Sequence, residues 1–404
     1  MSVLLAIIFA VFASAACIND LTPQGGWSAP IVEDEMLIVG NRDGNLVRFD
    51  PSTGNLDLSW RYPREDGLGA IYGSPVVVGE NVYGAGYTCR GDNCEGEIFG
   101  LSLADGSSIW GLRGLELKTK LIGQIAVVGN TLLVGTSALG EEKDGADGYL
   151  YALDTAPGSP RVKWRIALDG NAWSGVAVEG STAYVATMAG TVYAIDAADD
   201  ERFDSDPTSR ILWQFKADSA VAGPIQVKDG TIFFGDLGKS VYKLNTLSRA
   251  ASSSASEVNT GSGEWQIDVG TWVWAKPLIE NGVVFVSGLD GSIHALDEAT
   301  GAEKWSTLIE GQIVSAPILF DRKRGDTRER ALAVPSSEEN VWVVSVIDGQ
   351  PLGVFLTGEP VKSTPLIYGD NLYAHALNGD LQWFTVDDTN QRGCVDLKGG
   401  DRCD

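Results

Sequence analysis

The 404-residue sequence contains only two histidines, His294 and His375. Histidine is the usual general base of enzymes and a common metal ligand, so this scarcity argues against a histidine-based metal site or a Ser-His-Asp triad. Both histidines lie in or next to expected strands, and we interpret them as packing or surface residues. We therefore expect no metal site and no catalytic residue.

Positive charge is also scarce. The chain has 30 Lys and Arg residues against 54 Asp and Glu residues, which gives a formal net charge of −24. A surface this acidic repels a phosphate backbone, so the composition excludes nucleic acid as an expected partner. We interpret the acidity as a contribution to solubility, which carries no information about the fold.

Long apolar runs are missing as well. Residues 3–11 are all apolar, but they are too few to span a bilayer, which takes roughly 20 residues. The run has the length of the apolar part of a signal peptide, and small residues follow it, although no Lys or Arg precedes it. We predict a signal peptide over residues 1–16, lipidation of Cys17 and a tether over 17–24. The alternative is plain secretion after cleavage near residue 16. Either way, we expect an extracytoplasmic protein.

The five cysteines include no adjacent pair. Four of them form two local pairs, Cys89 with Cys94 and Cys394 with Cys403, and each pair would close a short loop. Such loops suit disulfides in an oxidising compartment. We predict both disulfides, the second in a C-terminal tail over residues 398–404. The fifth cysteine is Cys17, the residue that a lipoprotein would acylate.

Glycine and tryptophan are abundant, with 49 and 12 residues. Over residues 25–397 the chain repeats a unit of about 40–53 residues about eight times. Each unit reads as four short strands with Gly-rich turns, and the alternation of apolar and polar residues has the period of strands. Six units place a tryptophan in the fourth strand, as an expected anchor between sheets: Trp60, Trp110, Trp164, Trp213, Trp265 and Trp305.

Residues 295–305 read Ala-Leu-Asp-Glu-Ala-Thr-Gly-Ala-Glu-Lys-Trp. This segment resembles the repeat of the PQQ-like, quinoprotein-type propellers, Ala-Leu-Asp-x-x-Thr-Gly-x-x-x-Trp. The resemblance implies an all-β fold, an eight-bladed β-propeller of four-stranded antiparallel blades. Two modes of closure stay open, because the last outer strand could come from residues near 393–395 or from residues 18–24.

The same resemblance implies two functions. Quinoprotein dehydrogenases hold PQQ and Ca²⁺ on the propeller axis, but no adjacent cysteine pair is present and no Ca²⁺ ligand can be placed here. In length and expected anchoring the chain is closer to the BamB-like group of envelope lipoproteins. We therefore expect a noncatalytic scaffold without a cofactor. It would bind envelope proteins or peptides as a monomer and touch the membrane only through its lipid. A PQQ-dependent oxidoreductase is the alternative.

Five aromatic residues come just before expected innermost strands: Trp27, Tyr72, Trp173, Trp272 and Trp274. In propellers this position lies at one mouth of the central channel, so these side chains could bind a flat or apolar ligand, or an extended peptide. That possibility gives a third functional hypothesis, an extracytoplasmic ligand sensor. The competing interpretation is that the rings only pack between blades.

Overall fold

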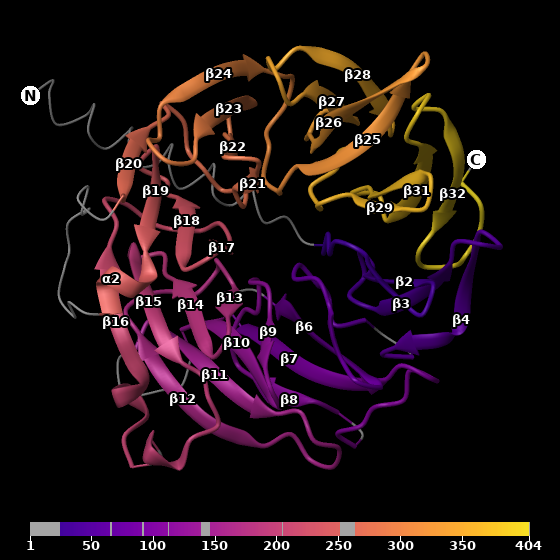
Figure 1. The fold of residues 1–404 in the computed structure, drawn as a ribbon. Coiled ribbons are helices and arrows are strands. Elements are labelled where there is room, and N and C mark those ends of the chain that lie inside the picture. Colours follow the sequence, from indigo (N-terminus) through magenta and orange to yellow (C-terminus); the bar gives the residue numbers. More distant parts are fainter. Residues whose placement is uncertain are drawn as a thin grey trace, which may run out of the picture.

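The computed structural model describes residues 25–64, 67–90, 93–111, 113–138, 146–203, 205–250 and 263–403. It forms a ring of eight sheets, each with four antiparallel strands hydrogen-bonded in sequence order (Figure 1). The predicted fold class is therefore confirmed. The predicted signal peptide, Cys17 and the tether lie outside the described residues and stay predictions. No described helix has the length and apolarity needed to cross a bilayer.

Strands β1 to β16 form the first four blades. Blade 1 contains β1 (Ile31–Glu33), β2 (Met36–Gly40), β3 (Leu46–Asp50) and β4 (Asn55–Tyr62). Blade 2 contains β5 (Val76–Val78), β6 (Asn81–Arg90), β7 (Asn93–Ser102) and β8 (Leu115–Leu117). Blade 3 contains β9 (Ala126–Val128), β10 (Thr131–Ser137), β11 (Gly148–Asp154) and β12 (Val162–Leu168). Blade 4 contains β13 (Val176–Glu179), β14 (Thr182–Ala186), β15 (Thr191–Asp196) and β16 (Ile211–Lys216).

The other four blades complete the ring. Blade 5 contains β17 (Gln226–Lys228), β18 (Thr231–Gly235), β19 (Ser240–Asn245) and β20 (Trp265–Asp268). Blade 6 contains β21 (Leu278–Glu280), β22 (Val283–Ser287), β23 (Ser292–Asp297) and β24 (Glu303–Leu308). Blade 7 contains β25 (Ile318–Arg324), β26 (Thr327–Pro335), β27 (Asn340–Ser345) and β28 (Pro351–Leu356). Blade 8 contains β29 (Leu366–Tyr368), β30 (Asn371–His375), β31 (Asp380–Thr385) and β32 (Gln391–Asp396).

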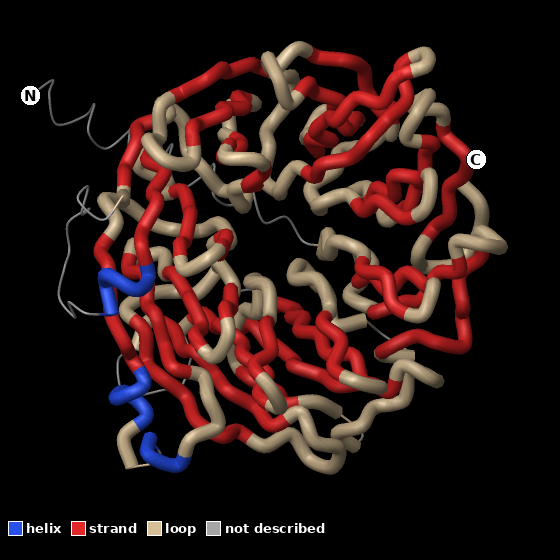
Figure 2. The backbone as a smooth tube through the Cα atoms, viewed as in Figure 1, coloured by secondary structure: helices blue, strands red, loops and turns tan. Residues whose placement is uncertain are grey.

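In the part of the chain that the structure describes, helix occurs as short segments on the outer side of the ring (Figure 2). These are two 3-10 turns, Glu201–Phe203 and Pro207–Arg210, and the helix α2, Thr246–Ala250. The middle strands have almost no exposed residue, as in β10, because other sheets cover both their faces. Outer strands such as β12 alternate exposed and buried residues, because only one of their faces packs on a neighbouring blade.

A tryptophan near the outer edge of one blade contacts the hairpin that joins the third and fourth strands of the next blade. The indole N–H of Trp60 donates to the carbonyl of Leu103 at 2.9 Å, and that of Trp265 donates to Glu298 at 3.1 Å. Trp305 donates in the same way to Val346 at 3.3 Å. These bonds satisfy a polar group that would otherwise be buried unpaired, and they fix the spacing of adjacent blades.

A glycine in that hairpin leaves space for the indole ring of the tryptophan. Gly301 and Gly349 both have φ of +73°, which suits glycine. A Cβ added to Gly301 would lie 2.9 Å from Trp265, and one added to Gly349 would lie 2.6 Å from Trp305. The Gly and the Trp of the repeat are therefore two halves of one contact, made between neighbouring blades rather than within one.

Blades 4 and 5 carry insertions in place of this hairpin, and a buried arginine covers the preceding aromatic ring. The Arg210 guanidinium lies 4.8 Å from the centroid of Trp164 and donates to the carbonyl of Ala198 at 2.8 Å. Arg249 lies 4.6 Å from the centroid of Phe215 and forms an ion pair with Glu264 at 2.6 Å. The inserted segments thus keep the inter-blade contact by means of a stacked cation.

One detail of the predicted tryptophan pattern is wrong, and one tryptophan contact was not predicted. Trp110 precedes the outer strand β8 rather than lying in it, because the strand is interrupted after an isolated bridge at Ser108. Its indole N–H still donates to the next blade, to Ala156 at 3.0 Å. Blade 8, which has no fourth-strand tryptophan, uses Trp383 of β31 instead. Gly393 faces it across the ladder and leaves space for its ring.

The ring closes between blade 8 and blade 1, which lie side by side in Figure 1. Of the two modes of closure, the first is correct, since β32 is the outer strand of blade 8. Phe49 packs against Trp383 with ring centroids 5.3 Å apart, and the side-chain amide of Asn41 donates to the carbonyl of Leu397 at 3.1 Å. Side-chain packing and hydrogen bonds therefore close the ring, and no strand of residues 25–403 as described is shared between its two ends.

The Gly–Trp contact can be tested with two glycines that share a backbone conformation. Gly358 has φ of +65° and Gly349 has φ of +73°, but a Cβ at Gly358 would meet nothing within 4 Å. We expect Gly358→Ala to cost about 1 kcal/mol through its backbone alone. Gly349→Ala should cost about 1–3 kcal/mol more, because its methyl group overlaps Trp305. Denaturant unfolding measures both, and equal losses would contradict the contact.

The hairpins between the third and fourth strands should also make the stability of the fold sensitive to acid. An ion pair with Lys304 and hydrogen bonds from Thr300 lower the pKa of Asp297 to about 2. Because the folded pKa lies below the ordinary value of 3.8, this stabilisation is present above about pH 4 and is lost as the pH falls toward 2. We expect Asp297→Asn to lower the thermal midpoint at pH 7. The difference from wild type should shrink at pH 2, and a difference independent of pH would contradict the assignment.

The equivalent hairpins of other blades also lower the pKa of an aspartate: Asp50, Asp105, Asp154, Asp348 and Asp388.

Candidate functional site

A cavity of about 460 Å³ lies where the segments that lead into the innermost strands of all eight blades converge. Glycines allow these segments to pack backbone against backbone. A Cβ at Gly123 would lie 2.5 Å from Gly175 in the next blade, and one at Gly223 would lie 2.0 Å from the carbonyl oxygen of Trp274. The close approach narrows the channel, so the side chains beside these glycines determine what the cavity can hold.

One side of the cavity carries an aromatic cluster from blades 1 and 2. Trp27 meets Tyr72 edge to face with ring centroids 4.4 Å apart, and Tyr72 lies 5.8 Å from Tyr87. Burial raises the pKa of Tyr72, so its hydroxyl stays neutral and can only exchange hydrogen bonds. Trp27 is partly exposed, whereas Tyr72 is buried with 8% of its surface accessible.

The opposite side carries a second cluster. The ring centroids of Trp173 and Trp274 lie 6.2 Å apart, and the indole N–H of Trp173 donates to the Ser137 hydroxyl at 3.0 Å. Trp272 belongs to the same apolar cluster but does not line the cavity. Of the five predicted residues, four therefore line the cavity: Trp27, Tyr72, Trp173 and Trp274. They also pack on one another, as the competing interpretation expected, and their role in binding stays a prediction.

Two lysines in the lining were missed in the sequence analysis, Lys276 and Lys362. Lys362 is 8% exposed, and its ammonium nitrogen lies 5.5 Å from the centroid of Trp27. Burial lowers the pKa of Lys276, and no ion pair joins it to a described carboxylate. A signal was available, since Lys362 occupies the repeat position where other blades have Trp27, Trp173 or Trp274.

The two histidines have structural environments. His375 is fully buried at the end of β30, where its Nδ1 lies 3.0 Å from the carbonyl oxygen of Ser28 across the closure of the ring. Burial lowers the pKa of His375 and so favours the neutral ring. His294 lies 2.7 Å from the Glu303 carboxylate. Neither histidine forms a cluster of candidate metal ligands among the described residues.

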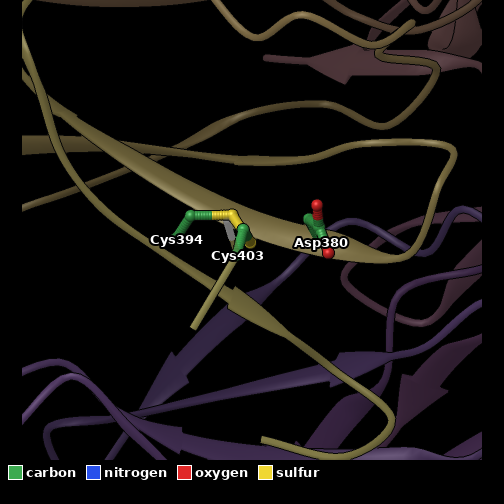
Figure 3. Close-up of side chains that lie close together, drawn as sticks. All are labelled: Asp380, Cys394 and Cys403. Atoms are coloured by element: carbon green, nitrogen blue, oxygen red, sulfur yellow. A yellow bond between two sulfur atoms is a disulfide. The ribbon is translucent and has the colours of Figure 1, made fainter. Parts of the chain in front are cut away.

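The structure contains both predicted disulfides, Cys89–Cys94 at the tip of the β6–β7 hairpin and Cys394–Cys403 beside the C-terminus. The second pair lies beside Asp380 (Figure 3), in the single cluster of candidate metal-ligand atoms that the described residues form. Its two sulfur atoms are bonded to each other, so no thiolate is available to a metal. We interpret this cluster as a covalent link between β32 and the tail.

The cavity does not fit the calcium that the quinoprotein resemblance implies. Ca²⁺ binds six to eight oxygen ligands and favours carboxylates. The described residues that line the cavity include no Asp or Glu, and they do include two lysines. The charge in the cavity therefore has the wrong sign for a Ca²⁺ site, and we derive no chemistry through PQQ.

Comparison with known proteins agrees with this architecture. The family model described as outer membrane protein assembly factor BamB matches residues 19–113, 94–203, 147–252 and 204–401. The chain belongs to the BamB family. It is 25% identical over 218 residues to BamB of Moranella endobia, a match that covers 50% of this chain and 52% of that protein. BamB of Yersinia pestis is 23% identical over 284 residues, 65% of this chain and 67% of that protein. The chain thus spans about half the length of the first relative.

Solved structures share the fold. BamB from Moraxella catarrhalis superposes with a TM-score of 0.61 at 16% identity, covering 88% of this chain and 92% of that one. The computationally designed protein Ika8 superposes with a TM-score of 0.62 at 13% identity, covering 90% and 97%. Identities this low show the fold alone, so the role of this BamB-family chain has to be argued from its own cavity and surface.

The unpaired state of Lys276 can be tested through stability. Replacing a partly buried cation that forms no ion pair with a described carboxylate by an apolar side chain of similar length removes a desolvation cost, so we expect Lys276→Met to stabilise the fold by about 1–2 kcal/mol at pH 7. The gain should shrink as the pH rises toward the ordinary lysine pKa of 10.5, where the wild-type side chain becomes neutral. The exposed Lys120 is the control, and Lys120→Met should change little. Destabilisation by Lys276→Met would show that its ammonium group has a partner.

Proposed function

We propose that this BamB-family chain is a noncatalytic propeller of the cell envelope, which binds polypeptides during the assembly of outer-membrane proteins. The relatives it matches are named as outer membrane protein assembly factors. Its cavity brings together aromatic rings, small residues and lysines rather than a nucleophile with a general base. The protein is extracytoplasmic, monomeric and in contact with the membrane only through a lipid on Cys17.

The observation that carries this proposal is an apolar cluster beside the cavity mouth, on blades 4 to 6. Around the buried Trp274 and Leu289 lie four partly exposed side chains, those of Trp173, Met188, Leu237 and Trp272. Tryptophan supplies much of the binding energy in protein interfaces, and methionine adapts to different partners. A surface of this kind suits many apolar segments rather than one rigid ligand.

Three equivalent turns hold this cluster on one face of the ring. Each turn joins the second and third strands of its blade and bonds to the segment that enters the same blade. Met188 donates from its backbone to Asn171 at 2.9 Å, Leu237 to Ala220 at 2.9 Å and Leu289 to Trp272 at 2.8 Å. The apolar side chains are therefore presented from hydrogen-bonded turns on a rigid scaffold, which limits the entropy lost on binding.

We expect a labelled outer-membrane β-barrel polypeptide, unfolded in urea and diluted into the protein, to bind with a rise in fluorescence anisotropy. The double variant Trp272→Ala and Met188→Ala should bind at least about tenfold more weakly, because it removes two anchors of the cluster. Leu308→Ala is the matched control. Leu308 is apolar and 69% exposed, but it lies on the outer strand β24, so its loss should change affinity by less than about twofold.

Two results would count against this function. Wild-type protein that does not bind the unfolded polypeptide would contradict it, as would equal losses in the cluster variant and the Leu308 control. Dye-linked alcohol oxidation on addition of PQQ and Ca²⁺ would instead favour the oxidoreductase alternative.

A further inference from the structure

We propose that the central cavity is a binding site for a small organic anion, in which a carboxylate is attached to a flat apolar body. This inference goes beyond the proposed function, because it concerns a small molecule on the axis of the ring. The polypeptide surface lies beside the mouth and shares Trp173 and Trp274 with the cavity wall. It rests on the charge of the cavity, its walls and its size.

The charged side chains in the described cavity lining have the opposite sign to the net charge of the chain. The chain carries a formal net charge of −24, yet the charged side chains among the described cavity residues are two lysines. Lys276 comes from the segment before β21, and Lys362 comes from the segment before β29, so two different blades direct ammonium groups to one cavity. An anion that enters it meets attraction in a partly desolvated space, where a charge pair is stronger than in bulk water.

The two lysines are held in different ways. Lys362 lies over the face of Trp27, with 5.5 Å between its ammonium nitrogen and the ring centroid, and this cation–π contact positions the charge. Lys276 has no ion pair with a described carboxylate, and burial disfavours its charged form. A bound carboxylate would form the ion pair that Lys276 lacks, so carboxylate binding and protonation of Lys276 should favour each other.

The walls suit a flat apolar group. Trp173 and Trp274 stand 6.2 Å apart on one side, and Trp27 with Tyr72 stands on the other. The volume of about 460 Å³ lies within the range of small-molecule sites, roughly 300–1,000 Å³. The hydroxyl of Ser315, another cavity residue, is buried without a hydrogen-bond partner among the described residues, so it is free to donate to an anion.

Calorimetric titration tests the site with three probes. We expect 2-naphthoate to bind saturably, and 2-naphthamide, which has the same shape without the charge, to bind at least about tenfold more weakly. Inorganic phosphate, which has the charge without the flat body, should also bind at least about tenfold more weakly. Equal affinity for the amide would overturn the role of the lysines, equal affinity for phosphate would overturn the role of the rings, and no binding of naphthoate would overturn the site.

Variants assign the binding to the two lysines. Lys276→Gln combined with Lys362→Gln should weaken naphthoate binding at least about tenfold, whereas Lys120→Gln, at an exposed lysine outside the cavity, should change it by less than about twofold. If the double variant does not fold, Lys276→Gln alone serves, because it breaks no described ion pair. Unchanged affinity in the lysine variants would overturn the assignment.

The two proposals can fail separately. Trp272 and Met188 lie outside the cavity lining, so their alanine variants should keep naphthoate binding while they lose polypeptide binding. The reverse pattern is expected for the lysine variants. Loss of both activities in both sets of variants would show one shared surface and would overturn the separate anion site.

Discussion

The contact between the tryptophan of one blade and the glycine hairpin of the next is the constraint on which the rest of this ring depends. A four-stranded sheet with apolar residues on both faces cannot bury them alone, so each blade needs both neighbours. Trp265 over Gly301 and Trp305 over Gly349 set the spacing between sheets, and Arg210 and Arg249 keep that spacing where insertions displace the hairpin. The inner segments are thereby brought close enough around the axis to form one cavity.

The sequence was sufficient to predict the architecture because its main signal is periodic. Strand alternation and Gly-rich turns recur in about eight units, and six of these units add a tryptophan, so the repetition turns several weak indications into one strong prediction. The two disulfides, Cys89–Cys94 and Cys394–Cys403, were predicted from the short spacing within each pair, since each closes a short loop. Trp383 was missed because it serves the contact from β31, and only the ladder shows that Gly393 opposite it leaves the space.

The site was harder to predict because its residues are distant in sequence and meet only at the axis. The aromatic residues stood out by type, and four of the five line the cavity. Lys276 and Lys362 did not stand out, because a lysine in a sequence is ordinarily a solvated side chain. Their role follows from their position in the cavity wall, where Lys362 is buried and Lys276 is partly buried, and from the lack of carboxylates in the described lining. Both are properties of the closed ring.

Closure without a shared strand has a topological consequence. Every blade is built from four consecutive strands, and blade 8 meets blade 1 through contacts such as Phe49 with Trp383 and Asn41 with Leu397. The two ends of the ring are thus ordinary neighbours rather than interleaved halves. The position at which the chain begins is therefore independent of the arrangement of the blades. A circular permutant cut between any two blades would contain the same eight complete sheets.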